Sequence, residues 1–440
     1  MVRHLCEIEH RHQSVEQTCH NSPMARSAPD LPSQLGPNLR ALRSNQERTL
    51  RDLEKVTGLT SGYLSQLERG EVGYPSPTVL RKLALGYGID PLILLQWAGY
   101  VADERLELSP NQAAALSTIG DPSTEELRAL QGIVEYLRSK GSAPNLPGST
   151  VPIVLDSVSR EEISGYARAL LLEADAFGER PTPLDTLQSA AELVRAEELQ
   201  LTPTDKAKLT SRLGRWVEIG WRRLRGSMDF RTRTIWIKPD LHPAARPFTV
   251  AHEIGHAILP AHEDFYVDTW NSLQPTFRSL LEQEANFAAT QLLFQCGQMV
   301  EEGDSSPIGL AEICALADRF GASIISTARH FAECSKHDVA LAVAHHPRAA
   351  MGPTYLYTSA GFEKRFCWRS GRAPADALRQ TLVSASSGVA TEEWDLLDAD
   401  GQDETVRVES LHTTWAALAL VVRDRSYRRA GRRLIDAVRS

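Results

Sequence analysis

A His-Glu-Ile-Gly-His pentapeptide occupies residues 252–256. Positions four apart lie on one face of an α-helix, so His252 and His256 could present two imidazole nitrogens to one cation. Glu253 lies about 100° around the helix from His252, which places its carboxylate beside the ion. A zinc peptidase needs this combination of two ligands and a base that takes a proton from a water molecule. The pattern predicts a catalytic metal site; the alternative is a hydrogen-bonded pair of core histidines.

The residues around the pentapeptide predict that it lies in a helix. Pro247 suits the first turn of such a helix, and Pro260 would end it soon after His256. An apolar stripe would pack behind the histidines, and it comprises Val250, Ile254, Ala257 and Ile258.

A catalytic zinc usually has three protein ligands, so a third ligand is expected downstream. His262 follows His256 by six residues, which is the spacing of the third histidine in one large protease group. That group has glycine three residues after the second histidine, where the chain turns tightly. Here Leu259 and Pro260 occupy the turn, so His262 is disfavoured as a ligand.

The preferred third ligand is Glu284, within a run over residues 279–293 that contains no Gly or Pro and predicts a helix. Small neighbours would let this helix approach the histidine helix closely: Ala285, Ala288 and Ala289. Glu282 would point elsewhere, either behind the ligands or into solvent. The alternative is that Glu284 only belongs to an amphipathic surface.

Three segments together resemble the ImmA/IrrE family of zinc metallopeptidases. They are Arg-Thr-Ile-Trp-Ile-Lys-Pro-Asp at 233–240, Arg-Pro-Phe-Thr-Val-Ala-His-Glu-Ile-Gly-His at 246–256, and Glu-Gln-Glu-Ala-Asn-Phe-Ala-Ala at 282–289. The resemblance covers about residues 155–335. It departs between Pro260 and Ser279, where this chain has a longer insertion that bears aromatic residues.

The resemblance implies a role for each motif residue. His252, His256 and Glu284 would bind zinc, and Glu253 would be the general base. It also implies a zincin-like peptidase domain with a small sheet. Ile235-Trp236-Ile237 reads as a short strand. It would lie either at a sheet edge, where a substrate backbone could be added, or in the core.

A second signature lies within residues 35–100. Thr49 could cap a helix over 50–57 that ends at Gly58, and Thr60 could cap a helix over 61–69. Two helices joined by a short glycine-containing turn form a helix-turn-helix, whose second helix enters the major groove of DNA. The segment, including Leu-Ser-Gln-Leu-Glu-Arg-Gly, resembles the domain of Xre-like phage repressors.

By that resemblance, outward residues of the second helix would contact bases: Ser61, Tyr63, Ser65 and Gln66. Phosphates would be contacted by Arg40, Arg43 and Arg69. Residues 35–100 hold eight Lys and Arg against six Asp and Glu, a weak positive balance in a chain of net charge −8. DNA affinity is therefore expected to need a homodimer. The alternative is a helical protein-interaction module.

The full chain of 440 residues is 42% hydrophobic, which suffices for two or three domains with their own cores. The expected fold class is α+β, mostly helical. The expected division is a disordered segment 1–34, a helix-turn-helix bundle 35–100, a helical extension and linker 101–153, a zinc peptidase domain 154–337, and a small α+β domain 338–440. The last could serve sensing or dimerisation.

Within the last domain, strands are expected at 339–344, 355–358, 362–368 and 416–422, followed by a basic helix. Residues 310–331, inside the peptidase domain, read as a second helix-turn-helix with a packing or docking role. No apolar run reaches the roughly 18 residues of a membrane span, and the six cysteines form no framework. Both features favour a cytoplasmic protein.

Together the motifs predict a DNA-binding zinc endopeptidase that controls transcription. Its expected partners are double-stranded DNA and a protein substrate, a helix-turn-helix repressor cut in a stress or mobile-element response. The chief alternative is a regulator whose peptidase-like domain senses a ligand and cleaves nothing. No residue that would stabilise an oxyanion can be assigned.

Overall fold

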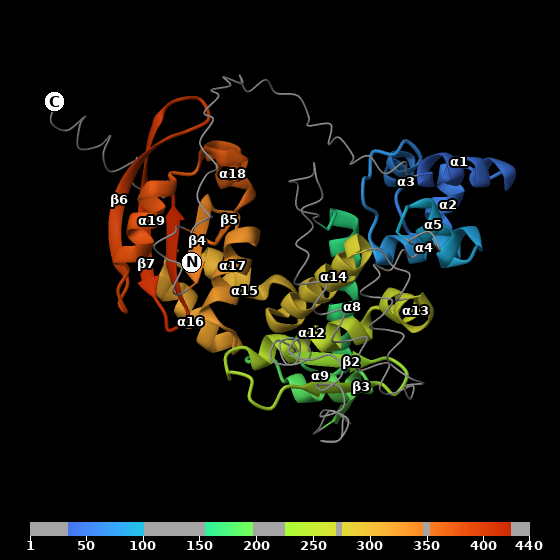
Figure 1. Cartoon of the computed structure of the whole chain (residues 1–440), viewed down its shortest axis with the longest axis horizontal. Helices are drawn as coiled ribbons and strands as arrows, with labels where there is room; N and C mark the ends of the chain where they lie inside the picture. Colours follow the sequence, from blue (N-terminus) through green and yellow to red (C-terminus); the bar gives the residue numbers. More distant parts are fainter. Residues whose placement is uncertain (1–33, 101–154, 197–224, 270–274, 346–352, 424–440) are drawn as a thin grey trace, which may run out of the picture.

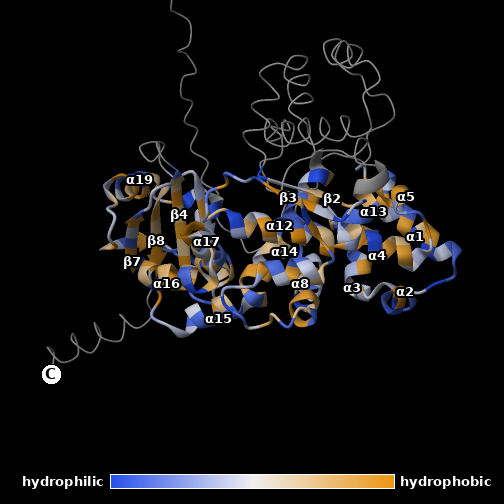
Figure 2. Cartoon of the chain, turned by 90° about the horizontal axis from the view of Figure 1, so that it is seen from below, coloured by the Kyte–Doolittle hydropathy of each residue, from blue (hydrophilic) through white to orange (hydrophobic). Residues whose placement is uncertain are grey.

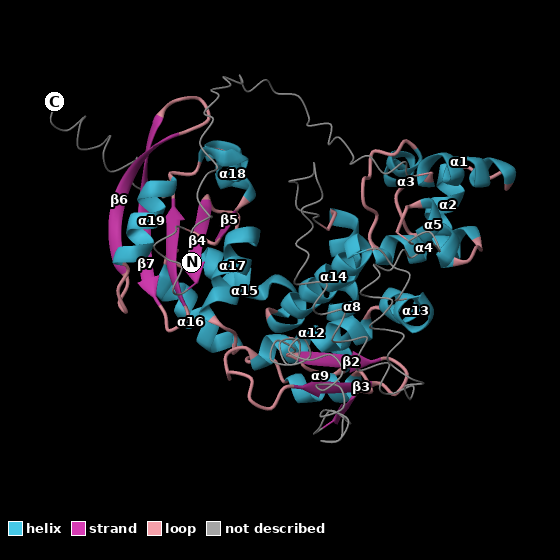
Figure 3. Cartoon of the chain, in the orientation of Figure 1, coloured by secondary structure: helices cyan, strands magenta, loops and turns pink. Residues whose placement is uncertain are grey.

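The computed structural model describes residues 34–100, 155–196, 225–269, 275–345 and 353–423 (Figure 1). Helices dominate, and the strands form two separate small sheets (Figure 3). The predicted class, α+β and mostly helical, is confirmed. The expected disordered segment 1–34, all but its last residue, the extension 101–153 and the terminal basic helix lie outside the described residues.

The N-terminal bundle contains the expected helix-turn-helix. Thr49 and Asp52 form a capping box at the start of the second helix, and Gly58 ends that helix in the left-handed region with φ 68°. The Thr60 hydroxyl caps the third helix by accepting the backbone N–H of Tyr63. The bundle comprises α1 (Leu35–Asn45), α2 (Leu50–Thr57), α3 (Ser61–Glu68), α4 (Pro77–Tyr87) and α5 (Pro91–Trp97).

The central part combines helices with a three-stranded sheet. Its elements are α8 (Ser157–Glu173), α9 (Leu184–Ala190), β1 (Val194–Ala196), β2 (Gly226–Asp229), β3 (Thr234–Ile237), α12 (Arg246–Ile258), α13 (Pro260–Thr269) and α14 (Pro275–Leu293).

The strand order is β1-β3-β2, with β1 parallel and β2 antiparallel to β3. β3 is therefore the middle strand, and Ile235, Trp236 and Ile237 are all buried. The interpretation of this segment as a sheet edge is wrong, because its alternating bulky side chains pack into the core. Among the described strands, β2 is the edge that lies next to α12.

α12 and α14 cross in close contact, and Gly255 makes that contact possible. A Cβ built on Gly255 would lie 2.9 Å from the carbonyl oxygen of Ala285 and 3.1 Å from the Cβ of Ala288. Both helices thus present minimal side chains where they meet, as the alanine-rich run predicted. Because α12 carries the pentapeptide, this contact determines which residues of α14 reach its histidines.

The next elements are η2 (Gln295–Gly297), α15 (Gln298–Ser305), α16 (Leu310–Phe320) and α17 (Ile324–Cys334). Gly321 joins the last two through a left-handed turn with φ 63°, so they have the predicted helix-turn-helix geometry. Phe320 and Phe331 belong to a hydrophobic cluster shared with the C-terminal sheet. This second helix-turn-helix therefore has a packing role.

The C-terminal sheet is antiparallel, with the order β5-β4-β8-β7-β6. Its strands are β4 (Val339–His345), β5 (Tyr355–Thr358), β6 (Ala390–Leu397), β7 (Asp403–His412) and β8 (Ala416–Val422). α16 and α17 cover one face, while α18 (Ala360–Phe366) and α19 (Ala375–Ser384) cover the other. Burial on both faces explains the continuous hydrophobicity of β4 and β8, visible in Figure 2.

The strand predicted at 362–368 is wrong, because Ala360–Phe366 is the helix α18 and η4 (Trp368–Arg372) follows it. The Ser359 hydroxyl caps α18 by accepting the backbone N–H of Phe362. Phe362 and Phe366, four residues apart, lie on one helix face with ring centroids 4.6 Å apart. β6 and β7 were not expected from the sequence.

The helix-turn-helix bundle packs directly on the central domain. One hydrophobic cluster contains core residues of the bundle, such as Leu83 and Leu95, together with Leu259, Phe265 and Leu280 of the central domain. α4, at the side of the blue bundle that faces the central domain in Figure 1, packs against α8, α13 and α14. The helix-turn-helix bundle and the central domain therefore share one hydrophobic core where they meet.

Candidate functional site

Two histidines and one glutamate converge where α12 meets α14. The Nε2 atoms of His252 and His256 are 3.1 Å apart, as expected for positions on successive turns. The Glu282 carboxylate lies 3.4 Å from Nε2 of His252 and 3.7 Å from Nε2 of His256. One candidate ligand atom from each residue lies within 4.8 Å of the others. Two imidazoles and one carboxylate are a donor set that suits a catalytic zinc ion.

Glu282 therefore replaces Glu284 as the third member of the site. Glu282 and Ala285 lie three residues apart on the face of α14 that meets α12, one turn from the Gly255 contact. Glu284 is about 200° around the helix from Glu282, so its side chain leaves in another direction. Small residues occur on both faces of α14, and the packing of the two helices selects Glu282.

Glu284 is fully buried behind the site, where it meets His262. Its Oε2 lies 3.1 Å from Nε2 of His262, and its Oε1 accepts the backbone N–H of Thr78 in α4 at 3.1 Å. Nδ1 of His262 lies 2.8 Å from Nδ1 of His256. His262, which the turn chemistry disfavoured as a ligand, contacts the candidate ligand His256.

Glu253 lies next to the histidine pair, beneath the edge strand β2. Its side chain is buried, with a residue exposure of 6%. A Cβ on Gly226 would lie 2.5 Å from Oε1 of Glu253, so the glycine leaves the room that the carboxylate occupies. Burial raises the pKa of Glu253 to about 7, an effect that His252 opposes and Glu282 reinforces.

The three converging side chains perturb one another strongly. Burial, reinforced by the charge of His252, lowers the pKa of His256 well below its ordinary value. The pKa of His252 is raised, because the hydrogen bond and charge of Glu282 outweigh burial. Burial opposes ionisation of Glu282, but its interactions with both histidines bring its pKa to about 2. The site thus holds an ionised carboxylate beside imidazoles, one of which, His256, stays neutral and able to ligate.

The outward side of α3 differs from the one predicted. Gln66 and Arg69 are exposed, and Ser61 and Ser65 are half-buried. Tyr63 is buried, with 8% exposure, and its hydroxyl donates to Asp156 at the start of α8. The expected base contact by Tyr63 is incompatible with this placement, because the ring shares the inward side of α3 with the core leucines.

The three arginines expected at phosphates have different surroundings. Arg43 makes two hydrogen bonds to Glu68, at 2.6 and 2.9 Å, and so ties α1 to α3. Arg69 pairs with Glu71 and also contacts the Ser65 hydroxyl. Arg40 is exposed on α1. The Arg43–Glu68 pair is the less exposed of the two ion pairs, because both of its side chains are largely covered.

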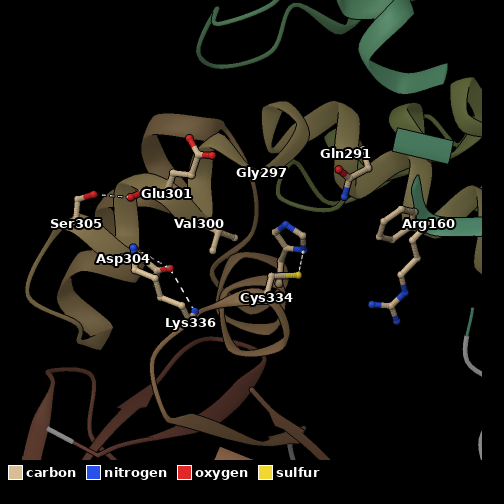
Figure 4. Close-up of a pocket in the computed structure, with 11 residues that line it drawn as sticks. Arg160, Gln291, Gly297, Val300, Glu301, Asp304, Ser305, Cys334 and Lys336 are labelled. Atoms are coloured by element: carbon tan, nitrogen blue, oxygen red, sulfur yellow. Dashed lines mark hydrogen bonds and ion pairs between the residues drawn. The ribbon is translucent and has the colours of Figure 1, made fainter. Parts of the chain in front are cut away.

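A separate cavity of about 520 Å³ lies between α8, α14, α15 and α17. Arg160 and Gln291 line one side, and Asp304 with Lys336 lines the other (Figure 4). Cys334 contacts the ring of His330 at 3.7 Å within it. The cavity contains none of the metal-site residues, so it is a distinct hollow with polar and charged walls.

The family described as "Helix-turn-helix domain" matches residues 34–93, and the one described as "IrrE N-terminal-like domain" matches residues 217–331. The second match contains the histidine pair, Glu253 and Glu282. The chain joins a helix-turn-helix domain to an IrrE-like domain of a metallopeptidase family. The resemblance expected from the motifs is thereby confirmed.

Two curated proteins match one domain each. The radiation response metalloprotease IrrE of Deinococcus radiodurans is 30% identical over 108 residues, which are 24% of this chain and 32% of that protein. The HTH-type transcriptional repressor RghR of Bacillus subtilis is 34% identical over 68 residues, 16% of this chain and 50% of that protein. The chain thus spans about a third and about a half of these relatives.

A solved structure described as a Mycobacterium tuberculosis transcriptional regulator is similar at a TM-score of 0.39. It shares 12% identity, and the match covers 60% of this chain and 76% of that one. A score this low carries no argument about fold or function. Within the described ranges, no helix combines the length and apolar character needed to cross a bilayer.

Proposed function

We propose that this IrrE-like regulator is a DNA-binding zinc endopeptidase that controls transcription by limited proteolysis of a helix-turn-helix repressor. The observation that carries the proposal is the convergence of His252, His256 and Glu282 next to the buried Glu253. When bound, zinc would polarise the scissile carbonyl and lower the pKa of a water molecule. The two histidines and Glu282 would hold the ion.

Glu253 supplies the proton transfers in this proposal. Its carboxylate accepts a proton from the attacking water and delivers it to the leaving amine. Among the described strands β2 is an edge of the sheet, and an extended peptide added to that edge would align the scissile bond over the site. Gly226 at the start of β2 keeps this space open, because a larger side chain there would meet Glu253.

The helix-turn-helix bundle brings the peptidase to DNA. The side of α3 that carries Gly62 and Gln66 is exposed and available for the major groove, although Tyr63 on the other side is buried. The domain has little excess positive charge, so a homodimer would supply the additional phosphate contacts. Proteolysis of a repressor bound nearby would then release its genes, in a stress or mobile-element response.

A ligand-sensing regulator is the second candidate, and the cavity in Figure 4 favours it. That cavity has room for a small molecule, and Arg160 and Lys336 could meet an anionic group. In this alternative the metal site would be structural, and Glu253 would have no chemical task.

Metal analysis with a cleavage assay tests the proposed function. Wild type should hold about one zinc per chain and cut a helix-turn-helix repressor offered as substrate. Glu282→Gln should lose most of the zinc and all cleavage, whereas Glu263→Gln, an exposed change on α13, should alter neither. Full zinc occupancy in Glu282→Gln would contradict the ligand assignment.

A further inference from the structure

A chain of buried polar contacts runs from the helix-turn-helix bundle to the metal site. Thr78 of α4 donates its backbone N–H to Glu284, Glu284 contacts His262, and His262 contacts His256. His262 and Glu284 are both completely buried. The four residues come from α4, α14, α13 and α12, so the chain crosses the boundary between the two domains.

The direction of each hydrogen bond in this series of four residues follows from one assumption, that His256 binds the metal through Nε2. Neutral His256 must then carry its proton on Nδ1 and donate it to Nδ1 of His262. His262 accordingly carries its proton on Nε2 and donates to Oε2 of Glu284. Thr78 donates to the other oxygen, so all the donors lead to the Glu284 carboxylate.

The Thr78 contact depends on the docking of α4. Thr78 is the second residue of α4, where backbone N–H groups have no partner within the helix and favour a carboxylate. Besides the shared hydrophobic core, two ion pairs join α4 to the central domain, Lys82 with Glu162 and Arg81 with Asp264, each at 2.6 Å. If α4 moved away, Glu284 would lose one of its donors inside a closed core.

We propose that Glu284 and His262 are positioning residues that couple zinc binding at His256 to the docking of the helix-turn-helix bundle. Docking fixes Glu284, Glu284 fixes the tautomer and orientation of His262, and His262 fixes His256. Thermodynamic coupling is reciprocal, so the factor by which docking raises zinc affinity is also the factor by which bound zinc favours the docked arrangement. The inference rests on the proposed function only in taking His256 as a ligand.

The first experiment measures zinc affinity by competition with a chromophoric chelator. Glu284→Gln is nearly isosteric but has only one acceptor oxygen for two donors, so one N–H must face its amide group. Loss of such a contact typically weakens metal binding about 10–100-fold. Glu263→Gln, adjacent to His262 but exposed, is the matched control and should bind zinc as wild type does.

The second experiment leaves the whole polar chain intact and weakens docking. Lys82→Glu faces Glu162 with a like charge, and zinc affinity should fall by about fivefold or more. Lys55→Glu makes the same charge change on the exposed side of the bundle and should have no effect. Adding Glu162→Lys to Lys82→Glu restores the pair and should restore the affinity.

Hydrogen exchange supplies a readout independent of activity. In wild type, zinc should slow exchange of the Thr78 amide, followed in a peptide covering α4, and in Glu284→Gln it should not. The coupling is overturned if Glu284→Gln folds normally and binds zinc as wild type does. It is also overturned if zinc leaves Thr78 exchange unchanged. Loss of zinc from Glu282→Gln together with either result would retain the metal site and reject only the coupling.

Discussion

Gly255→Ala tests the helix contact that builds the metal site. The added Cβ would lie 2.9 Å from the backbone oxygen of Ala285 and 3.1 Å from the Cβ of Ala288. Neither neighbour can rotate away, so α12 and α14 must move apart. Such overpacking costs about 1–3 kcal/mol, which exceeds the gain of up to about 1 kcal/mol in helix propensity.

Gly165→Ala on α8 is the matched control, because nothing lies within 4 Å of a Cβ built there. This exposed change should stabilise the protein by about 0.5–1 kcal/mol through helix propensity alone. Chemical denaturation should therefore separate the two variants by about 1–3 kcal/mol, with Gly255→Ala the less stable.

The same separation of helices would move Glu282 away from the histidines, which now lie 3.4 and 3.7 Å from its carboxylate. Zinc affinity should fall in Gly255→Ala and stay unchanged in Gly165→Ala. A Gly255→Ala protein as stable as Gly165→Ala, with wild-type zinc affinity, would refute the close helix contact.

Three further results are expected. Gln66→Ala should cost about 1–3 kcal/mol on the specific DNA site and little on random DNA in a binding titration. Tyr63→Phe should leave sequence preference unchanged and lower stability, because it removes the hydrogen bond from the Tyr63 hydroxyl to the half-buried Asp156; a changed sequence preference would restore the base-contact interpretation. Burial, with smaller contributions from nearby arginines, lowers the pKa of His330 from 6.5 to about 4. The contribution of neutral His330 to the free energy of unfolding is fully present above pH 6.5 and is lost as the pH falls towards 4. By pH 5 about 2 kcal/mol has been lost. Denaturation at pH 7 and pH 5 should show a smaller loss in His330→Gln, and an equal loss would contradict the burial argument.

Features with local signals were predictable from the sequence. The capping residues Thr49 and Thr60 and the turn residue Gly58 act on neighbours a few positions away, and all three have the expected geometry. The helix over the His-Glu-Ile-Gly-His pentapeptide followed in the same way from its apolar stripe and Pro260. These effects need no knowledge of the tertiary fold.

Features set by tertiary packing were not predictable. Glu282 and Glu284 are two residues apart with small residues near both, so only the docking of α14 on α12 distinguishes them. Tyr63 lies in the core cluster and donates its hydroxyl to Asp156, which is 93 residues later in the chain. The strand wrongly predicted at residues 362–368 is an exception, because local features indicated a helix there. These features are the capping residue Ser359 and the four-residue spacing of Phe362 and Phe366.

Glu253→Gln tests the central claim of zinc-dependent proteolysis most directly. The substitution keeps the size of the side chain beneath Gly226, so fold, zinc content and DNA binding should be retained. It removes the proton acceptor, and cleavage of the repressor should fall by about 10²–10⁴-fold, with loss of target-gene induction. Full cleavage and induction by a zinc-loaded Glu253→Gln protein would contradict the peptidase and favour the ligand sensor.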